Sequence, residues 1–194
     1  MGHIVLCNPP LNLLNVEFYE QLRDAVLSAT ADDLRAVLVR AEGPNFCGGG
    51  DAPVLNSLDT GGFRLLMAEF NRSFRALEAL PVPTVAAVRG HVFGGGVELV
   101  LSCDFIVAAA DATFRQIEVS VGNMPMAGGV QRMALLPGGA PDPQGVVGWR
   151  RPRRRRGDAR RRVLAARGDR RRAGTRGREE RLSPRSTQPI GWAA

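Results

Sequence analysis

A sharp change in composition near residue 137 constrains the fold of this 194-residue chain more than any other feature. Residues 1–137 hold nine Arg against 14 Asp and Glu, whereas residues 138–194 hold 17 Arg against five, so the two parts carry net charges of −5 and +12. The second part has few large apolar residues and no apolar periodicity, so it cannot bury enough surface to offset the entropy lost on ordering. We expect a folded region over residues 1–137 and a disordered, arginine-rich tail over residues 138–194.

The sequence leaves two explanations of the tail open. Clustered arginines neutralise phosphates and release counterions, so the tail would bind RNA or DNA non-specifically. Alternatively, the tail is a shifted reading frame, since GC-rich codons read out of frame yield mostly Arg, Gly, Pro and Ala. The regular pattern ends abruptly at Leu135–Leu136–Pro137–Gly138 instead of tapering through a linker, which favours the shifted frame.

The first part alternates between strand-like and helix-like patterns. Short apolar, β-branched runs predict strands, and apolar residues at helical spacing predict helices. The expected strands cover residues 4–7, 36–39, 84–88 and 105–109, and the expected helices cover residues 16–30, 63–80 and 97–102. Such alternation is typical of an α/β protein whose parallel strands are buried by helices and whose ligands bind where strands run out into loops.

The composition also argues against several classes of protein. The most apolar stretch, residues 97–110, is interrupted by Glu98 and Asp104, so we expect no membrane-spanning helix. Residues 1–4 lack the features of a targeting signal, which predicts a cytoplasmic protein. The three cysteines lie far apart without a CxxC pair, so we expect reduced thiols and no metal site.

Two glycine clusters follow predicted strands and could form one oxyanion site. Gly94–Gly95–Gly96 opens a predicted helix, where backbone N–H groups face outward and the helix dipole favours negative charge. Cys47–Gly48–Gly49–Gly50–Asp51 follows another strand, and each cluster could supply one donor to the same carbonyl oxygen. No nucleotide-phosphate motif is present. Close packing of the helix on a strand would also explain the triple glycine.

Two glutamates are candidates for acid–base chemistry. Glu98 lies in a very apolar predicted helix, and Glu118 follows a short apolar stretch. A carboxylate in apolar surroundings tends to a raised pKa, which suits proton transfer near neutral pH. Alternatively, each carboxylate caps a backbone amide or pairs with an arginine such as Arg89 or Arg115.

Three further residues are given no catalytic role. Cys47 has no clear base beside it, and a small thiol commonly just fills space. His91 follows a predicted strand end, where a structural role is expected. Asp104 precedes a predicted strand, so we interpret it as a turn or cap residue.

Several segments of the chain together form a recognisable family pattern. They are residues 9–15 (PPLNLLN), 46–51 (FCGGGD), 83–99 (PTVAAVRGHVFGGGVEL), 103–104 (CD), 114–118 (FRQIE) and 122–132 (GNMPMAGGVQR). Over residues 4–137 the sequence thereby resembles the crotonase superfamily of enoyl-CoA hydratases and isomerases. The resemblance implies an α/β fold built as a spiral of ββα units, incomplete here, and assembly as a homotrimer or hexamer.

The same resemblance implies a site. Acyl-CoA would bind with its thioester oxygen in an oxyanion hole formed by the N–H groups of Gly50 and Gly95, with Asp51 next to the first donor. In hydratases of the family two glutamates hold one water, and Glu98 and Glu118 fall on both positions. Glu98 would deprotonate the water and Glu118 would deliver a proton to Cα. No metal or redox cofactor is implied, because coenzyme A is part of the substrate.

The predicted function is that of an enoyl-CoA hydratase, a lyase acting on trans-2-enoyl thioesters in fatty-acid or related acyl-CoA breakdown. Two carboxylates favour hydration, because isomerases of the family often keep only one. The alternatives are an enoyl-CoA isomerase, a non-catalytic derivative whose tail binds nucleic acid, and a truncated product without function.

Three departures from the family pattern are visible. Gly50 stands where the family usually has Ala, and Met126 stands where it mostly has Gly. The family's C-terminal helices, which cover the acyl group and complete subunit contacts, are not recognisable after residue 137.

Overall fold

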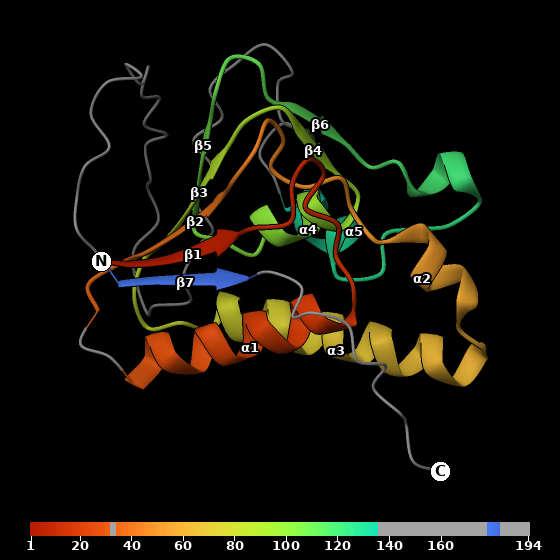
Figure 1. The fold of residues 1–194 in the computed structure, drawn as a ribbon, viewed down its shortest axis with the longest axis horizontal. Helices are drawn as coiled ribbons and strands as arrows, with labels where there is room; N and C mark the ends of the chain where they lie inside the picture. Colours follow the sequence, from red (N-terminus) through yellow and green to blue (C-terminus); the bar gives the residue numbers. More distant parts are fainter. Residues whose placement is uncertain (32–33, 136–177, 183–194) are drawn as a thin grey trace.

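A parallel five-stranded sheet forms the main layer of the computed structural model, which describes residues 1–31, 34–135 and 178–182 (Figure 1). The strand order is β5-β3-β2-β1-β7. The strands are β1 (Gly2–Leu6), β2 (Val37–Ala41), β3 (Thr84–Val88), β5 (Phe105–Ala108) and β7 (Arg178–Leu182). β1 is buried throughout, as a strand covered on both faces is, whereas β2 and β3 alternate between buried and half-buried residues, so one face of each is less completely covered.

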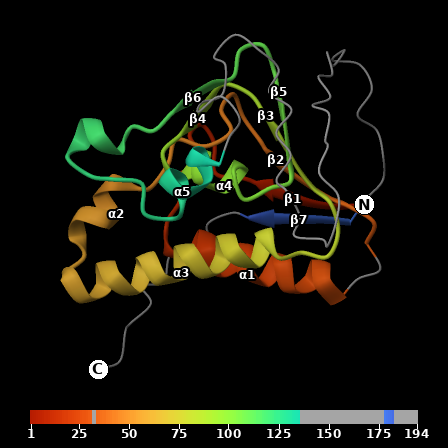
Figure 2. The same cartoon turned by 180° about the vertical axis from the view of Figure 1, so that it is seen from behind.

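Two long helices, α1 (Val16–Ala31) and α3 (Thr60–Glu78), run side by side along the main sheet (Figures 1 and 2). Each begins at a side-chain cap: Asn15 accepts a hydrogen bond from Phe18 N at 2.9 Å, and Asp59 accepts one from Gly62 N at 2.7 Å. Such caps satisfy backbone N–H groups that the first helical turn leaves unpaired. The apolar faces of both helices belong to one core with the strands.

A second layer of short strand segments lies beside the main sheet. β4 (His91–Phe93) pairs in parallel with β6 (Thr113–Arg115), and single bridges join Leu14 to Gly50 and Cys47 to Val92. Each main-sheet strand β1, β2, β3 and β5 is therefore followed by a segment of the second layer and then by helix. The later helices are α2 (Ala52–Ser57), α4 (Gly95–Val100), the 3₁₀ helix η1 (Glu118–Val121) and α5 (Gly129–Ala134). The predicted α/β spiral of ββα units is confirmed.

Asp104 links two neighbouring strands of the main sheet. Its Oδ2 accepts hydrogen bonds from Thr84 N at 2.9 Å and Thr84 Oγ1 at 3.1 Å, and Thr84 Oγ1 accepts one from Asp104 N at 2.8 Å. These bonds fix the starts of β3 and β5 against each other. The interpretation of Asp104 as a turn or cap residue is confirmed.

The expectation of a disordered tail requires one correction. Most of residues 138–194 lie outside the described residues, but residues 178–182 form β7 and pair in parallel with β1 over five positions. Pairing at a sheet edge is made by backbone N–H and C=O groups, so it does not require the apolar pattern on which the expectation rested. In the described part of the chain, no helix combines the length and the apolar character needed to cross a membrane.

Candidate functional site

Adjacent turns of the spiral bring Gly50 and Gly95 together. Gly50 lies in the second layer beside Leu14, and Gly95 begins α4 directly after β4. A Cβ built on Gly95 would lie only 4.0 Å from Gly50 N. Leu14 bonds to the residues on either side of Gly50, namely Gly49 O and Asp51 N, both at 2.9 Å. Within the described residues, neither the N–H of Gly50 nor that of Gly95 has a hydrogen-bond partner.

Close backbone packing holds the two glycine segments against each other. A Cβ on Gly96 would lie 2.8 Å from Cys47 Cβ and 2.9 Å from Cys47 O, so only glycine fits there without displacement. Gly49 has φ of +98°, a conformation that L residues rarely adopt. Close packing thus accounts for part of the glycine content, and it also leaves the two N–H groups side by side.

Asp51 lies next to this pair but makes no cap hydrogen bond with its side chain. It precedes α2, and its backbone donates to Leu14 and accepts from Leu55 N at 2.9 Å. The backbone therefore places Asp51, while its half-buried carboxylate stays at the edge of the site.

Glu98 is buried in α4, with only 4% of its surface exposed. Its Oε1 accepts hydrogen bonds from Ala127 N and Gly129 N, both at 2.8 Å. Burial raises the pKa of Glu98 to about 7; the two N–H donors oppose this rise, nearby Glu118 adds to it, and Arg132 lowers it. No described residue donates a hydrogen bond to Oε2, the second carboxylate oxygen.

The two alternatives offered for Glu98 thus have different outcomes. Its carboxylate does cap backbone amides, those at the start of α5. It does not pair with Arg89, which donates instead to Gly43 O at 3.0 Å and to Ala41 O at 3.4 Å. Capping occupies only Oε1, so it leaves the other oxygen available to a water or a ligand.

Glu118 approaches the same space from the next turn of the spiral. It begins η1 after β6, and a Cβ on Gly94 would lie 3.3 Å from Glu118 Oε1. In the amide orientation that satisfies its hydrogen bonds, Gln116 donates to Oε2 at 2.9 Å and to Oε1 at 3.0 Å. Burial raises the pKa of Glu118, opposed by a bond from its own N–H.

The side chain of Gln116 lies between the two carboxylates. A Cβ on Gly129 would lie 2.9 Å from Glu98 Oε1 and 2.7 Å from the end of the Gln116 amide that faces away from Glu118, which is its oxygen in this orientation. Gln116 therefore contacts Glu118 on one side and the Gly129 segment that caps Glu98 on the other. Glu118 is also close enough to Glu98 to raise its pKa, and burial raises the pKa of both carboxyl groups.

Arg132 supports the loop that caps Glu98. Its Nη1 donates to Ala127 O, and its Nε forms an ion pair with Glu78 at 3.2 Å. Both partners of this pair are largely buried, so α5 is joined firmly to the end of α3. Sequence reasoning assigned no role to Gln116 or Arg132, because their partners lie in other turns of the spiral.

Cys47 and His91 have surroundings that argue against catalysis. Burial raises the pKa of Cys47 to about 12, although Gly49 N donates to its Sγ at 3.4 Å, so a thiolate is strongly disfavoured. His91 is exposed and stacks on Phe93 with ring centroids 4.6 Å apart. Among the described residues, no three His, Cys, Asp or Glu side chains gather where they could hold a metal ion.

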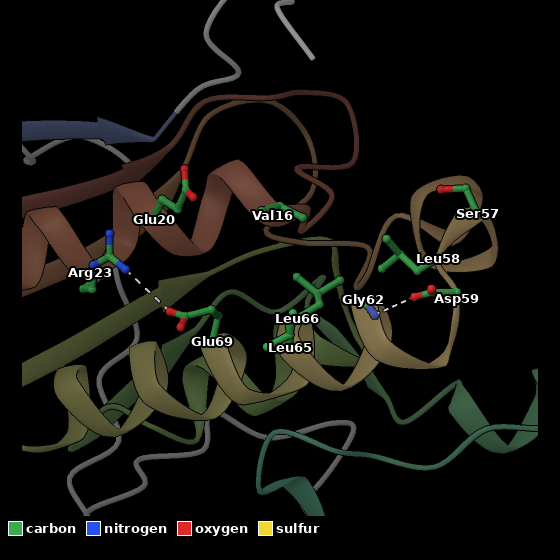
Figure 3. Close-up of a pocket in the computed structure, with 10 residues that line it drawn as sticks. All are labelled: Val16, Glu20, Arg23, Ser57, Leu58, Asp59, Gly62, Leu65, Leu66 and Glu69. Atoms are coloured by element: carbon green, nitrogen blue, oxygen red, sulfur yellow. Dashed lines mark hydrogen bonds and ion pairs between the residues drawn. The ribbon is translucent and has the colours of Figure 1, made fainter. Parts of the chain in front are cut away.

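A cavity of about 560 Å³ lies between α1, α2 and α3, away from the predicted site residues (Figure 3). The ion pair between Arg23 and Glu69, 3.5 Å apart, crosses one end, and Asp59 caps α3 at the other. Its lining residues are Val16, Glu20, Arg23, Ser57, Leu58, Asp59, Gly62, Leu65, Leu66 and Glu69. None of the five predicted site residues is among them.

Comparisons with known proteins indicate the family of the chain. Residues 1–138 match the family model of enoyl-CoA hydratase/isomerase. The chain is 35% identical over 130 residues to the crotonyl-CoA hydratase of Syntrophomonas wolfei, and the matched region covers 66% of this chain and 50% of that protein. It is 41% identical over 130 residues to a (7aS)-7a-methyl-1,5-dioxo-2,3,5,6,7,7a-hexahydro-1H-indene-carboxyl-CoA hydrolase of Mycobacterium tuberculosis, covering 64% of this chain and 51% of that protein.

A solved structure agrees as well. The structure of Pseudomonas aeruginosa DspI superposes with a TM-score of 0.66 and 30% identity, covering 70% of this chain and 58% of that one. The spiral of ββα units is therefore a crotonase fold. The chain belongs to the enoyl-CoA hydratase/isomerase family, as its resemblance indicated. It spans about half the length of the two curated relatives named above.

Proposed function

We propose that residues 1–137 form an acyl-CoA-binding unit whose site adds water across the α,β double bond of a trans-2-enoyl-CoA. The observation that supports this proposal is that two buried or half-buried carboxyl groups lie close enough to interact, on segments next to two N–H groups that have no partner among the described residues. Hydration needs these parts: donors for the thioester oxygen, a base for water and an acid for Cα.

The N–H groups of Gly50 and Gly95 would receive the thioester oxygen. When water attacks Cβ, electron density moves through the conjugated system onto that oxygen, and the enolate that forms is stabilised by both donors. Since neither N–H has to break an existing hydrogen bond with a described residue, the site is prepared before substrate arrives.

The two glutamates would then move the protons. Glu98 accepts a proton from the water through Oε2 while Oε1 stays bonded to its two backbone donors. Glu118 gives a proton to Cα, so the product gains one O–H group at Cβ and one hydrogen at Cα. A pKa of about 7 suits Glu98 for this task, because the group can take and release a proton near neutral pH. No metal or redox cofactor takes part in this scheme.

Double-bond isomerisation and hydrolysis of an acyl-CoA are competing functions. The family description includes isomerases, and the relative at 41% identity is named a hydrolase. Two carboxyl groups around one space favour hydration over isomerisation, which needs one group to move a single proton between carbons. Product analysis with a 3-enoyl-CoA distinguishes an isomerase from a hydratase, because only the isomerase moves the double bond. Release of a new carboxylate distinguishes a hydrolase from both.

The remaining proposals concern the whole protein. We infer assembly as a homotrimer or hexamer in the cytoplasm, and non-specific nucleic-acid binding by residues 138–194. Sedimentation tests the assembly. Deleting residues 138–194 tests the tail, because affinity for DNA that depends on it should fall steeply with salt and disappear in the deleted chain.

The decisive experiment follows the loss of enoyl absorbance when the full chain meets crotonyl-CoA. Glu98→Gln and Glu118→Gln should each lower turnover by about a hundredfold or more, because each removes one proton-transfer group. Glu20→Gln, a change on α1 beside the separate cavity, is the matched control and should retain native turnover. A loss below about tenfold for both site variants would end the hydratase assignment.

A further inference from the structure

Tyr19 carries a buried hydroxyl group that has no hydrogen-bond partner in the described part of the chain. The residue is 1% exposed, and its Oη is one of the few buried side-chain atoms without a partner. Buried hydroxyl groups are almost always satisfied, because burying one unpaired destabilises the fold. An orphaned hydroxyl in the core therefore calls for a specific explanation.

Aromatic packing fixes the direction of the Tyr19 ring. The ring stacks on Phe70 with centroids 3.5 Å apart and meets Phe18 edge-on at 5.2 Å. The backbone C=O of Tyr19 also accepts a hydrogen bond from Ser73 Oγ at 3.1 Å, which ties α1 to α3. The hydroxyl position is thus set by contacts that would persist without it.

The hydroxyl lies beside the two unpaired N–H groups. The Cβ position on Gly95 is 3.9 Å from Tyr19 Oη and 4.0 Å from Gly50 N. The same small region therefore borders the Tyr19 hydroxyl, the Gly50 amide and the first residue of α4. The Tyr19 hydroxyl and the N–H groups of Gly50 and Gly95 are all hydrogen-bond donors, and none of them has an acceptor among the described residues.

We propose that the Tyr19 hydroxyl is a third donor of this site, directed at the thioester oxygen of a bound acyl-CoA beside the N–H groups of Gly50 and Gly95. The nature of the ligand rests on the proposed function. The substrate then supplies the acceptor that the described residues lack, and the unpaired hydroxyl becomes a prepared binding group.

The hydroxyl keeps its proton in these surroundings. Burial raises the pKa of Tyr19 well above its ordinary value, and Cys47 and then Glu98 raise it further. Tyr19 therefore keeps its proton near neutral pH, can act as a donor there and does not compete with Glu98 as a base.

Tyr19→Phe removes the hydroxyl and keeps the stacked ring. We expect kcat/KM for crotonyl-CoA to fall by at least about tenfold, because one donor to the developing enolate is lost. The melting temperature should stay the same or rise, because no hydrogen bond within the described fold is broken. Val26→Ala, which removes a buried apolar group elsewhere on α1, is the packing control, and it should lower the melting temperature without a selective loss of turnover.

A second readout uses the fact that Tyr19 is the only tyrosine in the sequence. Fluorotyrosine incorporation gives a single fluorine resonance, which should shift when butyryl-CoA, a saturated thioester that cannot be hydrated, is titrated. A shift in a chain that fails to hydrate crotonyl-CoA would support the donor role and overturn the hydratase proposal. Any of three results would overturn the donor role. They are a native kcat/KM in Tyr19→Phe, a fluorine resonance that does not move when the chain is saturated with butyryl-CoA, and an absence of butyryl-CoA binding in calorimetry.

Discussion

Replacing Glu98 by Gln should stabilise the chain, and the gain should grow as the pH rises. The native carboxyl group has its pKa raised from 4.5 to about 7, chiefly by burial. Between these values the folded chain binds more protons than the unfolded chain, so the free energy of unfolding falls as the pH rises through this window. Each pKa unit corresponds to about 1.4 kcal/mol, so ionising Glu98 above pH 7 costs the fold about 3 kcal/mol.

Glutamine avoids this cost while keeping the contacts. Its amide oxygen can still accept the bonds from Ala127 N and Gly129 N that Oε1 accepts in the native chain. The substitution removes a titrating group without removing the cap. The difference in free energy of unfolding between Glu98→Gln and the native chain therefore measures the cost of burying the carboxylate.

Urea unfolding followed by circular dichroism measures that difference. From about pH 5 to about pH 8, the advantage of Glu98→Gln over the native chain should widen by roughly 2–3 kcal/mol. Asp111→Asn, which removes an exposed carboxylate between β5 and β6, controls for the loss of one negative charge and should show no comparable widening. An advantage that is the same at both pH values would refute the claim that α4 buries Glu98 at a cost.

Two further predictions concern packing and thiol reactivity. Gly96→Ala should lower the free energy of unfolding, measured in urea, by about 1–3 kcal/mol, because its Cβ would overlap Cys47. Gly61→Ala is the control: its Cβ would lie 3.5 Å from its nearest neighbour, so the substitution should be neutral or stabilise the fold by up to about 1 kcal/mol. When the folded chain meets an aromatic disulfide reagent, half-buried Cys7 should react well before Cys47 and Cys103, because those two thiols are buried and their pKa values are raised to about 12. Cys7→Ser should abolish this early phase of the reaction.

The main sheet was predictable because its strands carry a strong local signal. Residues 84–88 were expected as a strand and form β3 with the same bounds, and the expected strand over 105–109 differs from β5 by one residue. Asn15, a residue type that favours helix starts, directly precedes the expected helix over residues 16–30 and caps α1. These features depend on short stretches of sequence, where apolar periodicity and capping side chains act locally.

Family resemblance implied a second strand in each unit, but local pattern did not locate these strands, because they are too short to carry a period. β4 and β6 each have three residues, and the Leu14 and Cys47 segments are joined only by single bridges. α3 also begins at Thr60, three residues before the expected helix, because the Asp59 cap fixes its start ahead of the apolar pattern. β7 escaped prediction because backbone pairing with β1 does not require the apolar pattern by which strands were recognised.

The candidate site was predictable in its members but not in its supports. Apolar surroundings marked Glu98 and Glu118 as candidates, family resemblance implied their roles, and the glycine clusters were visible in the sequence. The cap on Glu98 could not be anticipated, because it comes from the start of α5, 31 residues further along the chain. Tyr19 follows the same helical apolar spacing as its neighbours, so nothing in the sequence separates its hydroxyl from an ordinary core residue.

The ββα repeat explains why these distant residues meet. Each turn leaves the second layer at a similar place, so Gly50, Gly95 and Glu118 each follow a second-layer segment and fall beside their counterparts in the neighbouring turns. A shift in one turn would therefore displace the donors relative to the acid. The orphaned hydroxyl of Tyr19 and the buried carboxyl of Glu98 both weaken the fold, and both border this junction. Polar groups that cost stability at one point of a well-packed core are best explained by a ligand that uses them.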